Sequence, residues 1–471
     1  MDTRIANYVA ALPEEAFQVD SAQAELAKLL DDLAVRPIPI NRVHRAWSLG
    51  TLSARIAAGW MATWVRGTFA SEEQRIQQKS EARLRAAFAI FGRMGYLRGA
   101  VMKVGQVIST YPDLVPKELA EMLSHLHFEA PSMHYALLAE HVRHELGGEP
   151  EEVFESFERE AFAAASLGQV HRATTLSGEA LAVKVQYPGI ARTIEADFRN
   201  LSVLCAPMML GVDRDNLQAQ YCYVRDMLLM ELDYESEAAF LERAREALRD
   251  VDEVVVPRVY REHSTRRVLS MERLEGLHLS EWLATNPSQA ERDRIATLLF
   301  RATGRLFFSE RLCWGDPHPG NIMILDDGRL GLLDFGSCRA FDDEEWSLIE
   351  LGVAGYREGG EKLMEAMRVS CDLSEKQAAD PDRMRYLEEY AMWYWESMCN
   401  EEEAFDFTDP EYIQRGMKLF GEASRKRYTR SHPMNLYNAR FLYGVRVLAH
   451  LMEARVYVGK ITSEELARAG F

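Results

Sequence analysis

The fold of this chain is decided by one stretch, residues 315–336, which reads GDPHPGNIMILDDGRLGLLDFG. Asp316 stands five residues before Asn321, and Asp334 opens the tripeptide Asp-Phe-Gly near the end of the stretch. Between them, Asp327-Gly328 separates two short apolar runs, a pattern that predicts a tight hairpin. The hairpin returns the chain on itself, so we expect Asp316, Asn321 and Asp334 to converge.

Converging carboxylate and amide groups of this kind suit phosphoryl transfer. That reaction depends on holding metal ions against phosphate oxygens while one carboxylate faces the attacking hydroxyl or water. Mg²⁺ prefers a few hard oxygen ligands with retained water, which one carboxylate and one amide oxygen supply. We therefore expect Asn321 and Asp334 to hold Mg²⁺ and Asp316 to orient the nucleophile. Each motif taken singly is also typical of ordinary turn residues.

Upstream, Lys184 lies in the segment ALAVKVQ, which predicts the second strand of a hairpin with its turn at 176–179. In protein kinases a strand lysine clamps the α- and β-phosphates and pairs with a carboxylate on the following helix. The segment ELDYESE, residues 231–237, offers Glu237 and Asp233 one helical turn apart. A surface lysine that extends its ammonium into solvent is the alternative for Lys184 alone. The order of the four motifs favours a kinase-like site.

The glycine-rich loop of protein kinases is missing, and an alanine-rich segment precedes Lys184 in its place. Alanine lacks the positive-φ freedom with which glycine wraps backbone around phosphates, so we expect a stiffer segment that holds a nucleotide differently. This disfavours a conventional Ser/Thr protein kinase. The candidate nucleotide contacts in the segment are Ala163, Ala164, Ala165, Ser166 and Gly168.

These motifs together resemble the UbiB/AarF group of atypical protein-kinase-like proteins, to which the coenzyme Q biosynthesis kinases belong. Two further segments carry the resemblance. Lys103-Val104-Gly105-Gln106 looks like the group's K-x-G-Q motif, and Glu231-Leu232-Asp233 looks like its E-x-D motif. The resemblance covers about residues 80–340, with the motifs in the group's order.

The resemblance implies an α+β, protein-kinase-like two-lobe fold with added N-terminal K-x-G-Q helices and a mostly helical C-lobe. Those helices are expected to cover the active site where a peptide substrate would otherwise dock. Lys184 is expected to pair with Glu237. The remaining candidate contacts of the nucleotide pocket and its covering element are Lys103, Gln106, Glu231, Asp233, Glu272 and Leu274.

The expected domain organisation has four regions. A helical extension occupies residues 1–80, and the K-x-G-Q helices occupy 81–150. A kinase-like N-lobe with a helical insertion follows at 151–275, and the helical C-lobe with the catalytic and Asp-Phe-Gly loops occupies 276–471. Strand candidates within the N-lobe include 254–260 and 267–271.

Composition and charge narrow the class of protein. Hydrophobic residues make up 47% and charged residues 27%, which is typical of a folded globular chain. The net charge of −18 repels phosphate backbones, so nucleic acid is not an expected partner. The six cysteines form no C-x-x-C pair, and no apolar run reaches the roughly 18 residues of a membrane span. We expect a cytoplasmic protein.

One basic segment departs from this acidic average. Residues 36–66 contain five arginines and no acidic residue, and Trp60 and Trp64 recur at helical spacing. An amphipathic helix of this kind contacts an anionic membrane peripherally or packs its tryptophans on the rest of the protein. Both interpretations stay open from the sequence.

The function expected from these features is an atypical kinase or ATPase that binds ATP or ADP with Mg²⁺. Its substrate would be a small or lipid-related molecule, and the resemblance alone suggests a role in quinone or isoprenoid lipid metabolism. The alternative is a pseudokinase-like regulator in which the bound nucleotide switches a lipid- or protein-binding surface.

Overall fold

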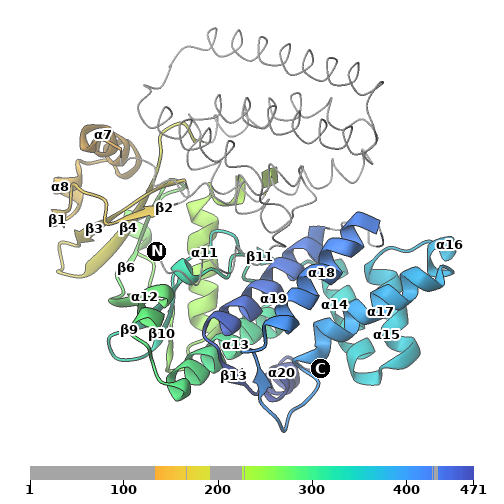
Figure 1. The fold of residues 1–471 in the computed structure, drawn as a ribbon. Coiled ribbons are helices and arrows are strands. Elements are labelled where there is room, and N and C mark those ends of the chain that lie inside the picture. The colour runs from red at the N-terminus through yellow and green to blue at the C-terminus, as the bar shows by residue number, and fades with distance from the viewer. Residues whose placement is uncertain (1–132, 166, 191–224, 227–228, 427, 429–432) are drawn as a thin grey trace, which may run out of the picture. The chain divides into compact units, whose positions relative to one another are not determined.

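The computed structural model describes residues 133–165, 167–190, 225–226, 229–426, 428 and 433–471. Within them, a β-containing part is followed by a largely helical part, as the colour sequence of Figure 1 shows. The α+β class expected from the sequence is confirmed. The expected domain boundaries at 80, 150 and 275 stay predictions.

The first sheet contains the strand of Lys184. Its order is β1-β3-β4-β6, and β2 pairs with β3 at the side. All its pairs are antiparallel. Its strands are β1 (Ser156–Phe157), β2 (Ala163–Ala165), β3 (Gly168–Thr174), β4 (Ala180–Gln186) and β6 (Val268–Glu272).

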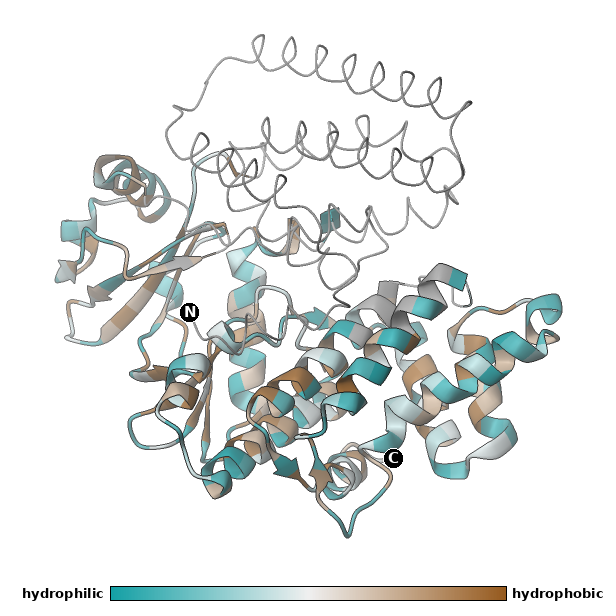
Figure 2. Ribbon diagram, in the orientation of Figure 1, coloured by the Kyte–Doolittle hydropathy of each residue, from teal (hydrophilic) through white to brown (hydrophobic). Residues whose placement is uncertain are grey.

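The predicted hairpin is present as β3 and β4. Their register pairs Thr174 with Ala180 around the expected turn, where Gly178 takes a positive φ of 89°. The helix α7 (Tyr135–Leu146) packs Leu138 and Val142 against the same apolar cluster as Val183. Figure 2 shows that the strands of this sheet carry both apolar and polar residues. Because β4 is buried over almost its whole length, it is a rigid base for its lysine.

The expectation for 254–260 was wrong in its extent. Only Val254–Val255 form a strand, β5, and it pairs with β10 of a different sheet. Val259 makes an isolated bridge to Met271. Pro257 lies between them and has no N–H for a ladder hydrogen bond, so the run is interrupted there. The neighbouring candidate, 267–271, is confirmed as β6 with a shift of one residue.

The second sheet contains the hairpin that the opening stretch predicts. Its order is β5-β10-β9-β7, and β9 and β10 pair antiparallel with Ile324 opposite Leu330. The turn closes where Gly328 N–H donates to the Leu325 carbonyl at 2.8 Å, with φ of 85° at Gly328. The strands added here are β7 (Gly276–His278), β9 (Ile322–Leu325) and β10 (Leu330–Leu332).

The remaining chain is mostly helical, as expected, with two short extra strand pairs. These are β8 (Leu312–Cys313) with β11 (Arg339–Ala340), and β12 (Phe405–Asp406) with β13 (Arg455–Val456). The helices from α11 onward are α11 (Tyr234–Ala247), α12 (Leu279–Ala284), α13 (Gln289–Glu310), α14 (Asp343–Glu358), α15 (Gly360–Ser370), α16 (Glu375–Ala378), α17 (Pro381–Glu396), α18 (Pro410–Lys426), α19 (Pro433–Leu451) and α20 (Val458–Arg468). None of the helices in the described ranges is long and apolar enough to cross a membrane.

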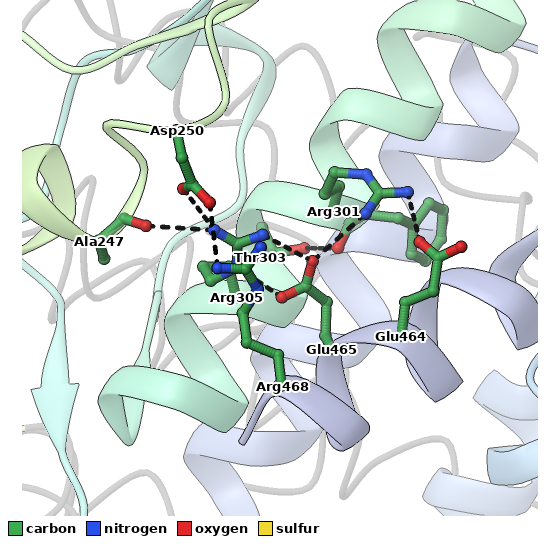
Figure 3. Close-up of polar contacts among 9 residues, drawn as sticks. Ala247, Asp250, Arg301, Thr303, Arg305, Glu464, Glu465 and Arg468 are labelled. Carbon is green, nitrogen blue, oxygen red and sulfur yellow. Dashed lines mark hydrogen bonds and ion pairs between the residues drawn. The ribbon is translucent and has the colours of Figure 1, made fainter. Parts of the chain in front are cut away.

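A buried ion pair joins α13 to α20 and to the end of α11 (Figure 3). Arg305 Nε lies 2.5 Å from Glu465 Oε2, and the two side chains are 5% and 1% exposed. Arg305 also pairs with Asp250 at 2.7 Å. On the surface side of the same cluster, the exposed Arg468 pairs with Asp250 at 3.0 Å.

We predict that Arg305→Met lowers the free energy of unfolding by up to about 3–5 kcal/mol, because it removes the buried cation of the Glu465 carboxylate and leaves only the longer contact with the partly exposed Arg301, at 3.4 Å. Arg468→Met is the matched control, since an exposed pair contributes only about 0–1 kcal/mol. Urea unfolding of both variants measures the difference. Equal losses in the two variants would contradict the account.

Candidate active site

Lys184 is held between two carboxylates from distant parts of the chain. Its Nζ lies 2.8 Å from Glu237 Oε1 and 2.8 Å from Asp334 Oδ2. The side chains of Lys184 and Glu237 are 10% and 1% exposed, whereas that of Asp334 is 31% exposed. The expected lysine–glutamate pair is therefore present, and the aspartate of Asp-Phe-Gly joins it from the more open side.

Local structure brings Glu237 to the lysine. Asp233 caps the start of α11, where its Oδ1 accepts from the Ser236 N–H at 3.3 Å. Gln186, two residues after Lys184, donates from Nε2 to the Leu232 carbonyl at 2.8 Å. The helix start is thereby fastened to β4, and Glu237 lies one turn further along.

The electrostatics of the three groups follow from burial and mutual charge. Burial opposes the charge of Lys184, but Asp334 and Glu237 hold its pKa well above the usual value. Burial raises the pKa of Glu237 to about 7, and repulsion from Asp334 adds to the effect against the attraction of Lys184. Lys184 is thus a fixed cation, while Glu237 titrates near neutral pH.

The catalytic segment and the Asp-Phe-Gly segment lie side by side. Asn321 closes the short helix η5 (Pro319–Asn321), and its Nδ2 donates to the Asp316 carbonyl at 2.9 Å. The Asn321 carbonyl accepts from the Leu333 N–H at 3.0 Å. Asp334 Oδ1 accepts from the Gly336 N–H at 2.9 Å. The predicted convergence of Asp316, Asn321 and Asp334 is found.

This arrangement fits a Mg²⁺ site in its donor chemistry. The Asn321 amide donates through nitrogen, which leaves its Oδ1 for a cation, and Asp334 supplies a partly exposed carboxylate nearby. In the described part of the chain, no group of three or more His, Cys, Asp or Glu side chains is placed to hold a metal. A Mg²⁺ ion retains water ligands, so one carboxylate and one amide oxygen from the protein suit it.

Sequence reasoning missed Arg440 of α19. Its guanidinium lies 2.6 Å from Asp316 Oδ1, and the two side chains are 7% and 17% exposed. Gly444, one turn further, lets the helix approach Pro317 so closely that a methyl group there would overlap the proline ring. Nothing in the sequence near Arg440 indicates this contact, because its partner is 124 residues away.

The two acidic residues of the E-x-D motif have separate structural partners. Glu231 Oε1 accepts from Ser337 Oγ at 2.7 Å in a buried contact, which ties the motif to the residue after Asp-Phe-Gly. Asp233 caps α11 and lies 3.5 Å from the Arg266 guanidinium. Of the two carboxylates that the sequence offers as partners of the lysine, Glu237 contacts it, whereas Asp233 contacts the helix start and Arg266.

The alanine-rich segment is a strand rather than a free loop at 163–165. Ala163 and Ala165 belong to β2 and lie opposite Val170 and Gly168 of β3. A side chain at Gly168 would overlap the Val185 carbonyl, so glycine is required for the close approach to β4. Ser166, like Lys103 and Gln106, lies outside the described residues.

Glu272 and Leu274 lie near the connection between the two sheets. Glu272 ends β6, accepts from the Arg258 N–H at 3.1 Å and lies 3.6 Å from Arg245. Leu274 borders Gly331 of β10, where an added methyl group would come within 3.2 Å of it. The Glu272 carboxylate is thus engaged by arginine and backbone, and a role of either residue with nucleotide stays a prediction.

The fold is protein-kinase-like: it has two sheets, a largely helical part, and a buried strand lysine, Lys184, paired with carboxylates. Residues 125–367 match the model of a protein family described as "ABC1 atypical kinase-like domain". Because that match extends over more than half of the chain, the chain belongs to the ABC1 atypical kinase-like family.

Named relatives agree with this assignment. The chain is 31% identical to "AarF domain-containing protein kinase 1" of Xenopus laevis over 56% of this chain and 50% of that protein. It is 27% identical to "Atypical kinase COQ8B, mitochondrial" of Danio rerio over 88% of this chain and 68% of that protein. The resemblance to the UbiB/AarF group is confirmed. In most of these relatives the matched part is only a portion of the protein. In "ACTIVITY OF BC1 COMPLEX KINASE 8, chloroplastic" of Arabidopsis thaliana, for example, it covers 36% of the length.

A solved structure has the same fold. The structure titled as the complex of Rv3197 with erythromycin from Mycobacterium tuberculosis aligns with a TM-score of 0.55 and 26% sequence identity. The alignment covers 84% of this chain and 98% of that one.

The raised pKa of Glu237 predicts a pH-dependent contribution to stability. The folded-state pKa of about 7 lies above the usual 4.5, so the contribution is complete below about pH 4.5 and is lost as the pH rises through 7. Between about pH 5 and pH 8, the wild-type protein should therefore lose free energy of unfolding relative to Glu237→Gln, which cannot titrate. Urea unfolding at both pH values measures this. Glu235→Gln, exposed on the same helix, is the control, and parallel pH curves for wild type and Glu237→Gln would refute the prediction.

Proposed function

We propose that this chain binds ATP with Mg²⁺ and either hydrolyses it or transfers its γ-phosphoryl group to a small or lipid-related acceptor. The observation that carries the proposal is the position of Lys184, whose Nζ lies 2.8 Å from both Glu237 and Asp334. A buried lysine fixed in this way presents one permanent positive charge to a phosphate group. The link to quinone or isoprenoid metabolism rests on the resemblance to coenzyme Q biosynthesis kinases alone.

The residues of the site divide into two roles. Lys184 would bind the α- and β-phosphates, with Glu237 holding it in place. Asp334 and Asn321 would hold Mg²⁺, which would supply positive charge to neutralise the phosphates. Nucleotide binding then replaces the Asp334–Lys184 contact, because the phosphates supply the negative charge that the lysine loses.

Asp316 would orient the attacking hydroxyl or water. Arg440 holds one of its carboxylate oxygens at 2.6 Å, and Asn321 holds its carbonyl. These contacts fix the direction of the carboxylate, which supports a positioning role for Arg440. A peptide acceptor is disfavoured, since alanines occupy the place of the glycine-rich loop and three of them belong to β2.

The membrane part of the proposal concerns residues 36–66, which lie outside the described residues. Their five arginines and spaced tryptophans favour peripheral contact with anionic lipid. A lipid-related substrate would reach the site more readily from such a surface. The proposed location is therefore the cytoplasmic face of a membrane.

The test is Mg²⁺-dependent ADP release from ATP by the purified chain, with and without anionic liposomes. Asp334→Asn should lower the rate of ADP release by about 100-fold or more, because it removes the negative charge that would hold Mg²⁺. Asp326→Asn, exposed on the β9–β10 turn, should retain wild-type activity.

Stimulation by liposomes that is lost when residues 36–66 are deleted would support the membrane part. Turnover unchanged in Asp334→Asn would overturn the proposed site. No turnover with retained nucleotide binding would instead favour the nucleotide-switched regulator.

Arg440 gives a second prediction for the same assay. Arg440→Gln should lower kcat by about 10-fold or more with nucleotide affinity changed less than about twofold, because the residue orients Asp316 rather than the phosphates. Arg440→Lys should restore part of kcat, since it keeps the positive charge. Thermal unfolding controls for folding, and a loss of affinity equal to the loss of kcat would contradict the positioning role.

A further inference from the structure

A cavity of about 200 Å³ lies in the helical part, among α13, α14, α15, α17, α19 and α20. Its walls are mainly aromatic and aliphatic. They include Phe300, Phe307, Val353, Tyr394, Trp395 and Phe441. Since an apolar cavity of roughly 150 Å³ holds benzene, this one has room for a ligand of about ten non-hydrogen atoms.

One wall of this cavity carries a buried cation. Arg446 of α19 lines it and is 1% exposed. Its NH2 donates to the Tyr394 carbonyl and lies 3.4 Å from Ser397 Oγ. Its Nε and NH1 are buried without a hydrogen-bond partner among the described residues. The ring of Trp393 lies 5.0 Å from the guanidinium carbon.

Burying a guanidinium without hydrogen-bond acceptors for its N–H groups destabilises the fold. Aromatic rings compensate part of the charge, but they accept no strong hydrogen bond. Within the described part of the chain, no carboxylate forms an ion pair with Arg446. Asn438, 7% exposed, also lines the cavity, and its Oδ1 likewise has no hydrogen-bond partner there. The unpartnered N–H groups of Arg446 therefore match an anionic head group, whereas Asn438 Oδ1 is itself an acceptor and would not bind it. The rest of the cavity matches an apolar body.

We propose that the cavity binds a medium-chain monocarboxylate, with its carboxylate on Arg446 and its hydrocarbon chain among the aromatic walls. A carboxylate oxygen accepts a strong, charge-assisted hydrogen bond from a guanidinium N–H, so it would satisfy one of the two unpartnered groups, Nε or NH1, which point to opposite sides of the guanidinium. An eight-carbon chain has the size that the volume allows. A multiply charged phosphate does not suit the apolar walls. This site is separate from the residues assigned to nucleotide and does not depend on their function.

The experiment measures binding of octanoate to the full chain by calorimetry and by the shift in Tm. Octanol, which has the same chain without the charge, and acetate, which has the charge without the chain, are the comparison ligands. Octanoate should raise Tm and bind at least 10-fold more tightly than either. Absence of octanoate binding, or equal binding of octanol, would overturn the proposal.

Two variants show whether binding occurs in this cavity. Gly352 of α14 lines it, and an added Cβ there meets no atom within 4 Å, so Gly352→Leu should fill the space and abolish octanoate binding without lowering Tm. Arg446→Met should remove the preference for octanoate over octanol, whereas Arg385→Met, 70% exposed on α17, should not. If Arg446→Met fails to fold, Gly352→Leu still shows whether octanoate binds in this cavity. Unchanged octanoate binding in Gly352→Leu would refute the site.

Discussion

The contact of one buried ammonium group with two carboxylates is the constraint on which the site depends. Lys184 lies in a strand that is buried over almost its whole length, where an unpaired charge would be strongly unfavourable. Glu237 and Asp334 compensate it from positions 53 and 150 residues away. The strand β4, the helix α11 and the segment after β10 are therefore held at one point, and this is the point where a phosphate group would be bound.

The surrounding contacts limit how far each of these elements can move. Glu231 ties the start of α11 to Ser337, directly after Asp-Phe-Gly. Trp314 lies just before the catalytic segment, and its indole nitrogen donates to the Asp334 carbonyl at 2.8 Å. Because these partners flank the motifs, the aspartate that would hold a metal is fixed from both sides. A charged site of this kind is preorganised rather than assembled by its ligand.

The helix α19 contributes to two separate places in the helical part. Arg440 holds the Asp316 carboxylate, and Arg446 borders the apolar cavity. Six residues correspond to about 600° of helical rotation, so the two arginines project from different faces of the helix. Among the described residues, Arg440 has a carboxylate partner and Arg446 has none. Arg440 therefore positions another residue of the chain, whereas Arg446 borders a cavity that suits a ligand.

The sequence by itself determined the local chemistry of this protein. The spacing of Asp316, Asn321 and Asp334 around an Asp-Gly turn predicted their convergence, since hairpin geometry follows from nearby residues. Lys184 was predicted from the order of the motifs, and its pairing with Glu237 from the resemblance to the UbiB/AarF group. Tertiary structure alone decided that β5 joins β10 in the second sheet and that Arg440 reaches Asp316. Those outcomes depend on contacts between residues far apart in the chain, for which sequence periodicity and spacing contain no signal.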